Sequence, residues 1–260
     1  MIPLDVLDAF GLPHTATPLV GGQGNSWRVG DFVLKPHEES YEGISVIVNQ
    51  LRPKNFRVSY HHKTKDGNFT YRGWGCTCFE LGEEVTGRIT EKYAVARELH
   101  SLLGTIQKPE NWKPSDSPWS QAHEIVWGER ELPSDIHPEI YATIEEFFGF
   151  VTPLTLPNQI IHGDLCGNIL FHETLTPVVI DFSLDYRPRE YAEAILIADS
   201  IAWENGGEEA YSLLPPDSEQ ILLRACLFRL ITKALLKPQD TQNFRERSGG
   251  YITILKKILR

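Results

Sequence analysis

The sequence predicts an α+β protein of two lobes, a small β-rich lobe of residues 1–82 and a larger helical lobe of residues 83–260. Short apolar runs separated by glycine-containing turns fill the first part of the chain. Beyond Gly82, apolar residues recur every three or four positions, as on the buried face of a helix. The 260 residues include 6 Trp, 9 Tyr and 12 Phe, enough apolar volume for a substantial core.

The first lobe reads as strands around one short helix. A glycine cluster lies between strand-like residues in 19–29, and Gly30-Asp31 is expected to turn tightly into a strand over 32–35. The spacing predicts a helix over 41–51, which Pro53 follows. Two further strand-like runs, 56–62 and 69–81, are joined by the turn Lys65-Asp66-Gly67-Asn68 and together predict a meander.

The second lobe reads as mainly helical. Helices are predicted over 91–103, 136–150, 190–203 and 219–236. Short strands are expected at 160–161, 169–171 and 178–182, and the proline-rich stretch 109–118 is expected to be a surface loop. The helix over 219–236 is apolar nearly all round, which predicts that it is buried.

Charge and composition exclude some classes of protein. The formal net charge is −10 with no local concentration of cations, which disfavours nucleic-acid binding and would suit a cationic ligand. We see no signal-peptide pattern and no apolar run of membrane-spanning length, so a cytoplasmic protein is expected. The 4 cysteines show no CxxC spacing, and buried reduced thiols are favoured over a metal site.

The sharpest motif is His162-Gly163-Asp164-Leu165-Cys166-Gly167-Asn168, followed by Asp181 at the end of an apolar strand. Two carboxylates and one amide oxygen are thereby placed at the ends of short strands. Phosphoryl transfer uses such a set, because one carboxylate can accept the proton of an attacking hydroxyl and hard oxygens bind Mg²⁺. The alternative is a pair of turns in which Asp164 and Asn168 only cap backbone groups.

A second motif lies upstream. The glycine-rich segment Leu19–Val29 includes Gly22, Gln23, Gly24 and Asn25, and Lys35 follows on the next strand. Glycines let backbone N–H groups approach phosphate oxygens, and a lysine adds a point charge. The cluster matches neither the dinucleotide-binding fingerprint nor the Walker pattern, and alone it could be a simple hairpin turn.

The order of these motifs resembles that of the aminoglycoside phosphotransferase-like family of the protein-kinase-like fold, which includes choline and fructosamine kinases. The matching pieces are L-V-G-G-Q-G-N-S-W-R-V, V-L-K at Lys35, H-G-D-L at His162–Leu165, N-I-L-F from Asn168 and V-I-D at Asp181. The chain is still more similar to uncharacterised actinobacterial-type members, which share G-G-Q-G-x-x-W-R-V-G and H-G-D-L-x-G-N. The resemblance spans about Leu19 to Tyr191 and implies a two-lobed protein-kinase-like fold.

The resemblance also implies roles for residues. Asp164 becomes the catalytic base or hydroxyl-orienting residue, His162 an orienting residue, and Asn168 and Asp181 the Mg²⁺ ligands. The phosphoryl donor is ATP or GTP. Nucleotide contacts are then implied for Gly22, Gln23, Gly24, Asn25 and Lys35, and for the hinge residues Phe79, Glu80 and Leu81.

Two features depart from the family pattern. Most members have four residues between the catalytic Asp and the Asn, whereas three separate Asp164 from Asn168. The strand lysine usually pairs with a helix glutamate fifteen to twenty positions later, where this chain has none. Lys35 would then be held by an amide, by Glu42, or only when nucleotide binds.

Together these observations predict a small-molecule kinase that phosphorylates a polar hydroxyl compound, with a cationic acceptor such as an amino sugar favoured by the charge. Acceptor-site candidates are Asp185, Trp119 and Trp127, although the same aromatic residues could belong to the core. The alternative is a nucleotide-binding sensor or partner-binding pseudokinase without phosphoryl transfer, as the two departures would suggest. A hydrolase is disfavoured because no Ser or Cys nucleophile has a suitable elbow.

Overall fold

The computed structural model describes residues 1–19, 24–37, 40–110 and 115–259. The chain divides into two compact units. The first unit comprises Met1–Val85, Ser101–Ser115 and Gly167–Leu184, and the second comprises Thr86–His100, Asp116–Cys166 and Asp185–Arg260. The predicted division at residue 82, between a nucleotide-binding lobe and a lobe with the acceptor site, concerns function and stays a prediction.

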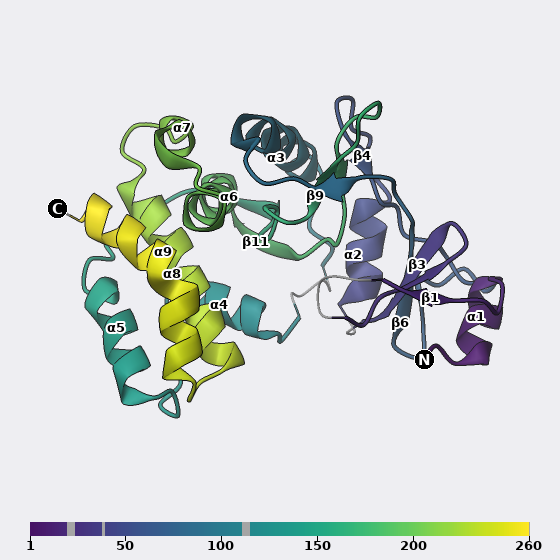
Figure 1. The fold of residues 1–260 in the computed structure, drawn as a ribbon, viewed down its shortest axis with the longest axis horizontal. Helices are drawn as coiled ribbons and strands as arrows, with labels where there is room; N and C mark the ends of the chain where they lie inside the picture. The colour runs from purple at the N-terminus through teal and green to yellow at the C-terminus, as the bar shows by residue number, and fades with distance from the viewer. Residues whose placement is uncertain (20–23, 38–39, 111–114, 260) are drawn as a thin grey trace. The chain divides into compact units, whose positions relative to one another are not determined.

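The first unit contains an antiparallel sheet with strand order β1-β2-β3-β6-β5, of which Figure 1 labels β1, β3 and β6. Its strands are β1 (Thr17–Pro18), β2 (Trp27–Val29), β3 (Phe32–Pro36), β5 (Thr70–Tyr71) and β6 (Trp74–Cys78). Val29 pairs with Phe32, which confirms the predicted turn at Gly30-Asp31. Gly30 has φ 61, a conformation that glycine adopts without steric cost.

Two helices belong to the same unit. Helix α1 (Leu4–Phe10), which the sequence analysis did not predict, buries Val6, Leu7 and Phe10 in a core shared with Leu34 of β3. Helix α2 (Tyr41–Val48) confirms the helix predicted over 41–51 but ends three residues earlier. These elements hold β3, and therefore Lys35, in a fixed register opposite β6.

A second sheet of this unit has strand order β4-β10-β9-β7. Its strands are β4 (Arg57–Val58), β7 (Glu83–Glu84), β9 (Ile169–Phe171) and β10 (Val178–Val179). The predicted meander is confirmed only in part: the N–H groups of His62 and Cys78 bond across to Cys76 and Tyr60, but β4 pairs in parallel with β10. Buried valines at 58, 178 and 179 favour this pairing, which brings residues 167–184 into the unit.

The second unit is mainly helical. The helices that lie wholly or mainly in it are α3 (Ile89–Leu103), α4 (Pro118–Val126), α5 (Pro138–Phe148), α6 (Arg189–Trp203), α7 (Gly207–Ser212), α8 (Glu219–Leu236) and α9 (Thr241–Ile258), with the strand pair β8 (Asn158–His162) and β11 (Leu184–Pro188). Helix α8 packs against α4, α6 and α9 (Figure 1). Its residues from Ile221 to Thr232 are all buried, which confirms the expectation for 219–236.

Helix α9 was not among the predicted helices, and it contains the pair Gly249-Gly250 in its interior. The structure shows why Gly250 suits a helix interior here: a Cβ at this position would lie 2.8 Å from the Cα of Ala202 in α6. The missing side chain thus permits close packing of the two helices. Within the described ranges, no helix is both long enough and apolar enough to cross a membrane.

Candidate active site

In the first unit, the ammonium group of Lys35 forms an ion pair with Asp181. Lys35 lies on β3, and Asp181 follows β10 in a left-handed conformation with φ 49. Such a φ is unfavourable for a residue other than glycine, although Asp and Asn tolerate it best, and backbone strain of this kind is frequent at functional sites. The fold therefore joins two residues of the predicted nucleotide and metal site that are 146 positions apart.

Glu42 is not the partner of Lys35. Its carboxylate accepts hydrogen bonds from the Phe69 N–H at 3.1 and 3.0 Å and from the Thr70 hydroxyl at 3.4 Å. This contact fastens α2 to β5. Of the three partners that the sequence left open for Lys35, Glu42 is therefore excluded by the structure.

Aromatic rings of the first unit pack near Lys35. The Tyr41 ring stacks on His37 with a centroid distance of 3.6 Å and on His61 at 4.7 Å. Burial, and then the charge of Lys35, lowers the pKa of His37 to about 2 and that of His61 to about 3, so both rings are neutral. Gly75 lies opposite Lys35, and a Cβ there would come within 2.3 Å of the Tyr41 ring.

The predicted hinge residues follow β6. The Phe79 N–H donates to the Asp31 carbonyl at 2.8 Å, and the Arg28 guanidinium lies 3.8 Å from the centre of the Phe79 ring. Arg57 pairs with the Glu80 carboxylate and donates to the Leu81 carbonyl at 2.7 Å. The Phe79 amide and the Leu81 carbonyl are therefore already engaged within the unit.

The backbones at Asn168 and Asp181 are close in space, because the N–H of Ile180, the residue before Asp181, donates to the Asn168 carbonyl at 3.0 Å. Glu84 adds a carboxylate nearby: a Cβ at Gly167 would lie 3.3 Å from its Oε1. No cluster of three His, Cys, Asp or Glu residues suited to a metal occurs in the described part of the chain. Mg²⁺ commonly takes one or two protein oxygens and completes its shell with phosphates and water, so this donor set fits it.

In the second unit, Asp164 sits in a loop that buried histidines support. The Asp164 N–H donates to His162 Nδ1 at 3.2 Å, and the His162 N–H donates to Nε2 of His100 at 3.3 Å. Burial, and then the neighbouring His162, lowers the pKa of His100 to about 3, which keeps its ring neutral. Gly163 leaves room for His123, whose Nε2 would lie 2.9 Å from a Cβ at this position.

The Asp164 carboxylate accepts a hydrogen bond of 2.7 Å from Nη2 of Arg229 in α8. Arg229 also bonds both oxygens of Asp199 in α6, with an Nε to Oδ1 distance of 2.9 Å. Burial would raise the pKa of Asp164, but the charge and hydrogen bond of Arg229 outweigh it and hold the pKa below its usual value. Asp164 is therefore ionised at neutral pH, and its side chain is 38% exposed.

A residue of α9 also binds the Asp199 carboxylate. The Tyr251 hydroxyl donates to Asp199 Oδ1 at 2.6 Å, and the Trp203 Nε1–H donates to the Tyr251 hydroxyl oxygen at 2.7 Å. Sequence reasoning did not identify Arg229 or Asp199. A usable signal existed, because a charged residue within an almost wholly apolar helix needs a buried partner of opposite charge.

The remaining predicted residues have mixed environments. Gly22 and Gln23 lie outside the described residues, and Gly24 and Asn25 are exposed. Asp185 is buried beside Arg187, and burial raises its pKa to about 6. Trp119 packs against the core of the second unit, and Trp127 contacts the Tyr191 ring edge-on at 5.4 Å. The involvement of these residues in an acceptor site stays a prediction.

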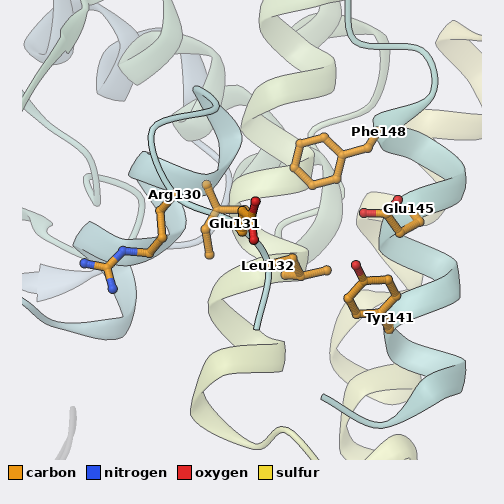
Figure 2. A pocket seen from close by; sticks show the side chains of 7 residues that line it. Arg130, Glu131, Leu132, Tyr141, Glu145 and Phe148 are labelled. Atoms are coloured by element: carbon orange, nitrogen blue, oxygen red, sulfur yellow. The ribbon is translucent and has the colours of Figure 1, made fainter. Parts of the chain in front are cut away.

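A pocket of about 410 Å³ lies between α4, α5 and the loop that joins them (Figure 2). Its lining residues are Ile125, Arg130, Glu131, Leu132, Tyr141, Glu145 and Phe148, which include none of the predicted site residues. Figure 2 shows Tyr141, Glu145 and Phe148 projecting from α5 toward Leu132, whereas the Arg130 guanidinium points away. Arg130 is paired with Glu124 and Asp116.

Comparison with solved structures identifies the fold. The choline kinase LicA from Streptococcus pneumoniae is similar with a TM-score of 0.64 at 11% identity, covering 97% of each chain. A thermostable mutant of the aminoglycoside phosphotransferase APH(4)-Ia reaches 0.65 at 12% identity over 98% of this chain and 99% of that one. This chain has the protein-kinase-like fold of these phosphotransferases.

A third similar structure, the amicoumacin kinase hAmiN in complex with AMP-PNP, Ca²⁺ and Ami, has a TM-score of 0.61 at 14% identity over 95% of this chain and 87% of that one. No family model and no curated protein sequence matches the chain. The comparisons thus confirm the predicted protein-kinase-like fold through structure alone, at identities too low to assign a substrate.

Proposed function

We propose that the chain is a small-molecule kinase that transfers the γ-phosphoryl group of ATP or GTP to a hydroxyl group. The observation that carries the proposal is the Asp164 carboxylate, which Arg229 keeps ionised, which is partly exposed, and whose loop is supported by the contact between His162 and the neutral His100. A protein that only bound nucleotide would not need a carboxylate held ionised in this loop. Similar structures that contain AMP, ADP or AMP-PNP support the use of a nucleotide.

In the reaction, the acceptor oxygen forms a bond to the γ-phosphorus while the bond from that phosphorus to the β,γ-bridging oxygen breaks, which releases the nucleoside diphosphate. Asp164 accepts the proton of the acceptor hydroxyl. A carboxylate of low pKa is a weak base, so its main contribution is to orient the hydroxyl, as suits a loose transition state. The departing proton then passes from Asp164 to solvent.

Lys35 would contact the nucleotide phosphates, and Asn168 and Asp181 would hold the Mg²⁺. When bound, Mg²⁺ neutralises charge on the phosphates. Lys35 and Asp181 are paired with each other in this structure, so each must exchange that contact for a phosphate or a metal ion. The adenine or guanine base would pair with the remaining backbone groups of Glu80 and Leu81.

We assign nucleotide binding to residues 1–82 and the acceptor site to residues 83–260, with residues 167–184 supplying the metal ligands. The acceptor is a polar hydroxyl compound, for which the net charge favours a cation, and not a nucleic acid. All four cysteines are free, and burial raises the pKa of the Cys166 thiol far above its usual range. These unreactive thiols suit a reducing compartment such as the cytoplasm.

The test is a phosphorylation screen of a metabolite library with ATP and Mg²⁺, read by mass spectrometry. Asp164→Asn should lower turnover by about 10²–10⁴-fold and leave nucleotide affinity nearly unchanged, because it replaces the carboxylate that orients the acceptor hydroxyl and accepts its proton. Asp116→Asn, which alters an exposed paired carboxylate, is the matched control. Full activity of Asp164→Asn on an identified acceptor would refute the proposal.

The second candidate is a nucleotide-binding sensor without phosphoryl transfer. It is favoured by Lys35, which pairs with Asp181 and not with a helix glutamate, and by the short loop between Asp164 and Asn168. Thermal-shift titration with ATP and Mg²⁺ separates the candidates when combined with the screen. Stabilisation by nucleotide without any product across the library would favour the sensor.

A further inference from the structure

Lys233 of α8 is a cation without a matching anion. Its Nζ lies 4.6 Å from the centre of the Tyr251 ring and 5.7 Å from that of Trp203. It donates no hydrogen bond and forms no ion pair with any described residue, and its side chain is half-buried. Its Nζ is not among the fully buried polar atoms that lack a partner, so its three donors can be reached by water or by a ligand.

The carboxylates nearest to Lys233 are already engaged. Arg229 bonds Asp164 and both oxygens of Asp199, and Tyr251 donates to Asp199 as well. Burial and the charges of Arg229 and Arg247 lower the pKa of Lys233 to about 8, while Asp199 and Asp164 partly offset this. Lys233 is therefore charged at neutral pH, within electrostatic range of Asp164.

A second cation lies on the same aromatic group. The Arg247 guanidinium is 5.8 Å from the centre of the Trp203 ring, and Trp203 is 46% exposed. Arg247 has no ion-pair partner in the described part of the chain. The charges that act on Lys233 are those of Arg229, Arg247, Asp199 and Asp164, so these four groups and Lys233 together carry one net positive charge in a chain whose overall charge is −10.

The geometry points to an anion subsite next to Asp164, in which Lys233, Arg247 and the exposed face of Trp203 bind a phosphate or carboxylate group. Lys233 supplies charged N–H donors, Arg247 a planar pair of donors, and the Trp203 indole an apolar wall. The ligand is either an anionic group of the acceptor or the phosphoryl group in transfer. In this respect the inference rests on the proposed function and deepens it.

The first experiment uses inorganic phosphate as the probe and needs no turnover, so its outcome is independent of whether the chain is a kinase. Calorimetry compares the wild type with Lys233→Met and with Lys256→Met, which removes an exposed lysine of α9 and is the matched control. Lys233→Met should weaken phosphate binding about tenfold or more, because it removes a charge-assisted hydrogen bond, and Lys256→Met should not. Equal binding by all three proteins, or none by the wild type, would overturn the subsite.

A measurement on the wild type covers the case in which Lys233→Met fails to fold. In protein with ¹³C-labelled lysine side chains, the Lys233 signal is assigned by its absence from Lys233→Arg. Saturating phosphate should raise the pKa of Lys233 from about 8, since a bound anion stabilises the ammonium form. An unchanged pKa would mean that Lys233 only balances Asp164 and Asp199, which would overturn the proposal.

Kinetics with an identified acceptor, and with an analogue that lacks its anionic group, distinguish the two possible ligands: an anionic group of the acceptor and the phosphoryl group in transfer. If Lys233→Met raises KM only for the anionic compound, the subsite binds the acceptor. If it lowers kcat equally for both compounds and leaves KM unchanged, the subsite contacts the phosphoryl group. Wild-type values of both constants for both compounds would overturn the inference.

Discussion

Replacing Arg229 by methionine removes the cation that joins Asp164 to Asp199. Methionine is unbranched and fills much of the same space, so loss of charge is the main change. The side chains of Arg229 and Asp199 are 9% and 5% exposed, whereas that of Asp164 is 38% exposed. The substitution therefore leaves one carboxylate buried and unpaired and another that water can reach.

The free energy of unfolding should fall by about 3–5 kcal/mol, the usual cost of breaking a buried ion pair from one side. Almost all of this cost arises at Asp199, which loses its ion pair and keeps the hydrogen bond from the Tyr251 hydroxyl. Asp164→Asn should cost much less, about 0.5–1.5 kcal/mol, because Arg229 keeps its charge partner Asp199 and water reaches position 164.

Urea unfolding followed by tryptophan fluorescence measures these changes. The double variant Arg229→Met/Asp199→Asn should recover at least about 1 kcal/mol relative to the sum of the single changes, because no buried charge remains unpaired. Asparagine at position 199 can still accept the hydrogen bond from Tyr251.

Activity gives an independent readout of the same contact. Without Arg229, burial raises the pKa of Asp164, so the acidic limb of the pH–rate profile should move to higher pH. The reasoning is refuted if Arg229→Met costs less than Asp164→Asn, or if the double variant shows no coupling between the two positions.

Three further predictions concern the remaining charges. Asp181→Asn should weaken Mg²⁺-dependent nucleotide binding more than Asn168→Ala, because it removes a full charge from the metal site. Asparagine is chosen because it tolerates the left-handed backbone at position 181. Calorimetry that gave the reverse order would contradict this ranking of the two metal ligands. Lys35→Ala should weaken ATP binding about tenfold and leave adenosine binding unchanged, whereas equal losses would indicate a purely structural lysine. Folding lowers the pKa of four described histidines, with burial as the largest cause: His37, His61, His100 and His123. They take up protons on unfolding below about pH 6.5, so the free energy of unfolding should fall between pH 6.5 and 5 by up to about 1.4 kcal/mol per pH unit for each, partly offset by Asp185, whose pKa is raised to about 6. Urea titrations across this range that show no decline would contradict the neutral state of these rings.

The sequence by itself determined the order of the motifs and most of the secondary structure. The hairpin turn at Gly30-Asp31, the helix over 219–236 and the motif around Asp164 depend on residues close together in the chain, so local pattern reveals them. Helix α9 was not predicted, and the reason why Gly250 suits its interior lies in another helix, at Ala202. A glycine that permits close packing looks the same in sequence as one that ends a helix.

Only the tertiary structure decided which charges pair. Glu42 was a candidate partner for Lys35 by its place in the sequence, yet its carboxylate binds the Phe69 amide, and Lys35 pairs with Asp181. Likewise, nothing near Asp164 in the chain indicates Arg229, 65 residues later. Helix packing decides which charged groups are removed from water together, and a group removed from water must be matched by whatever the fold brings within reach.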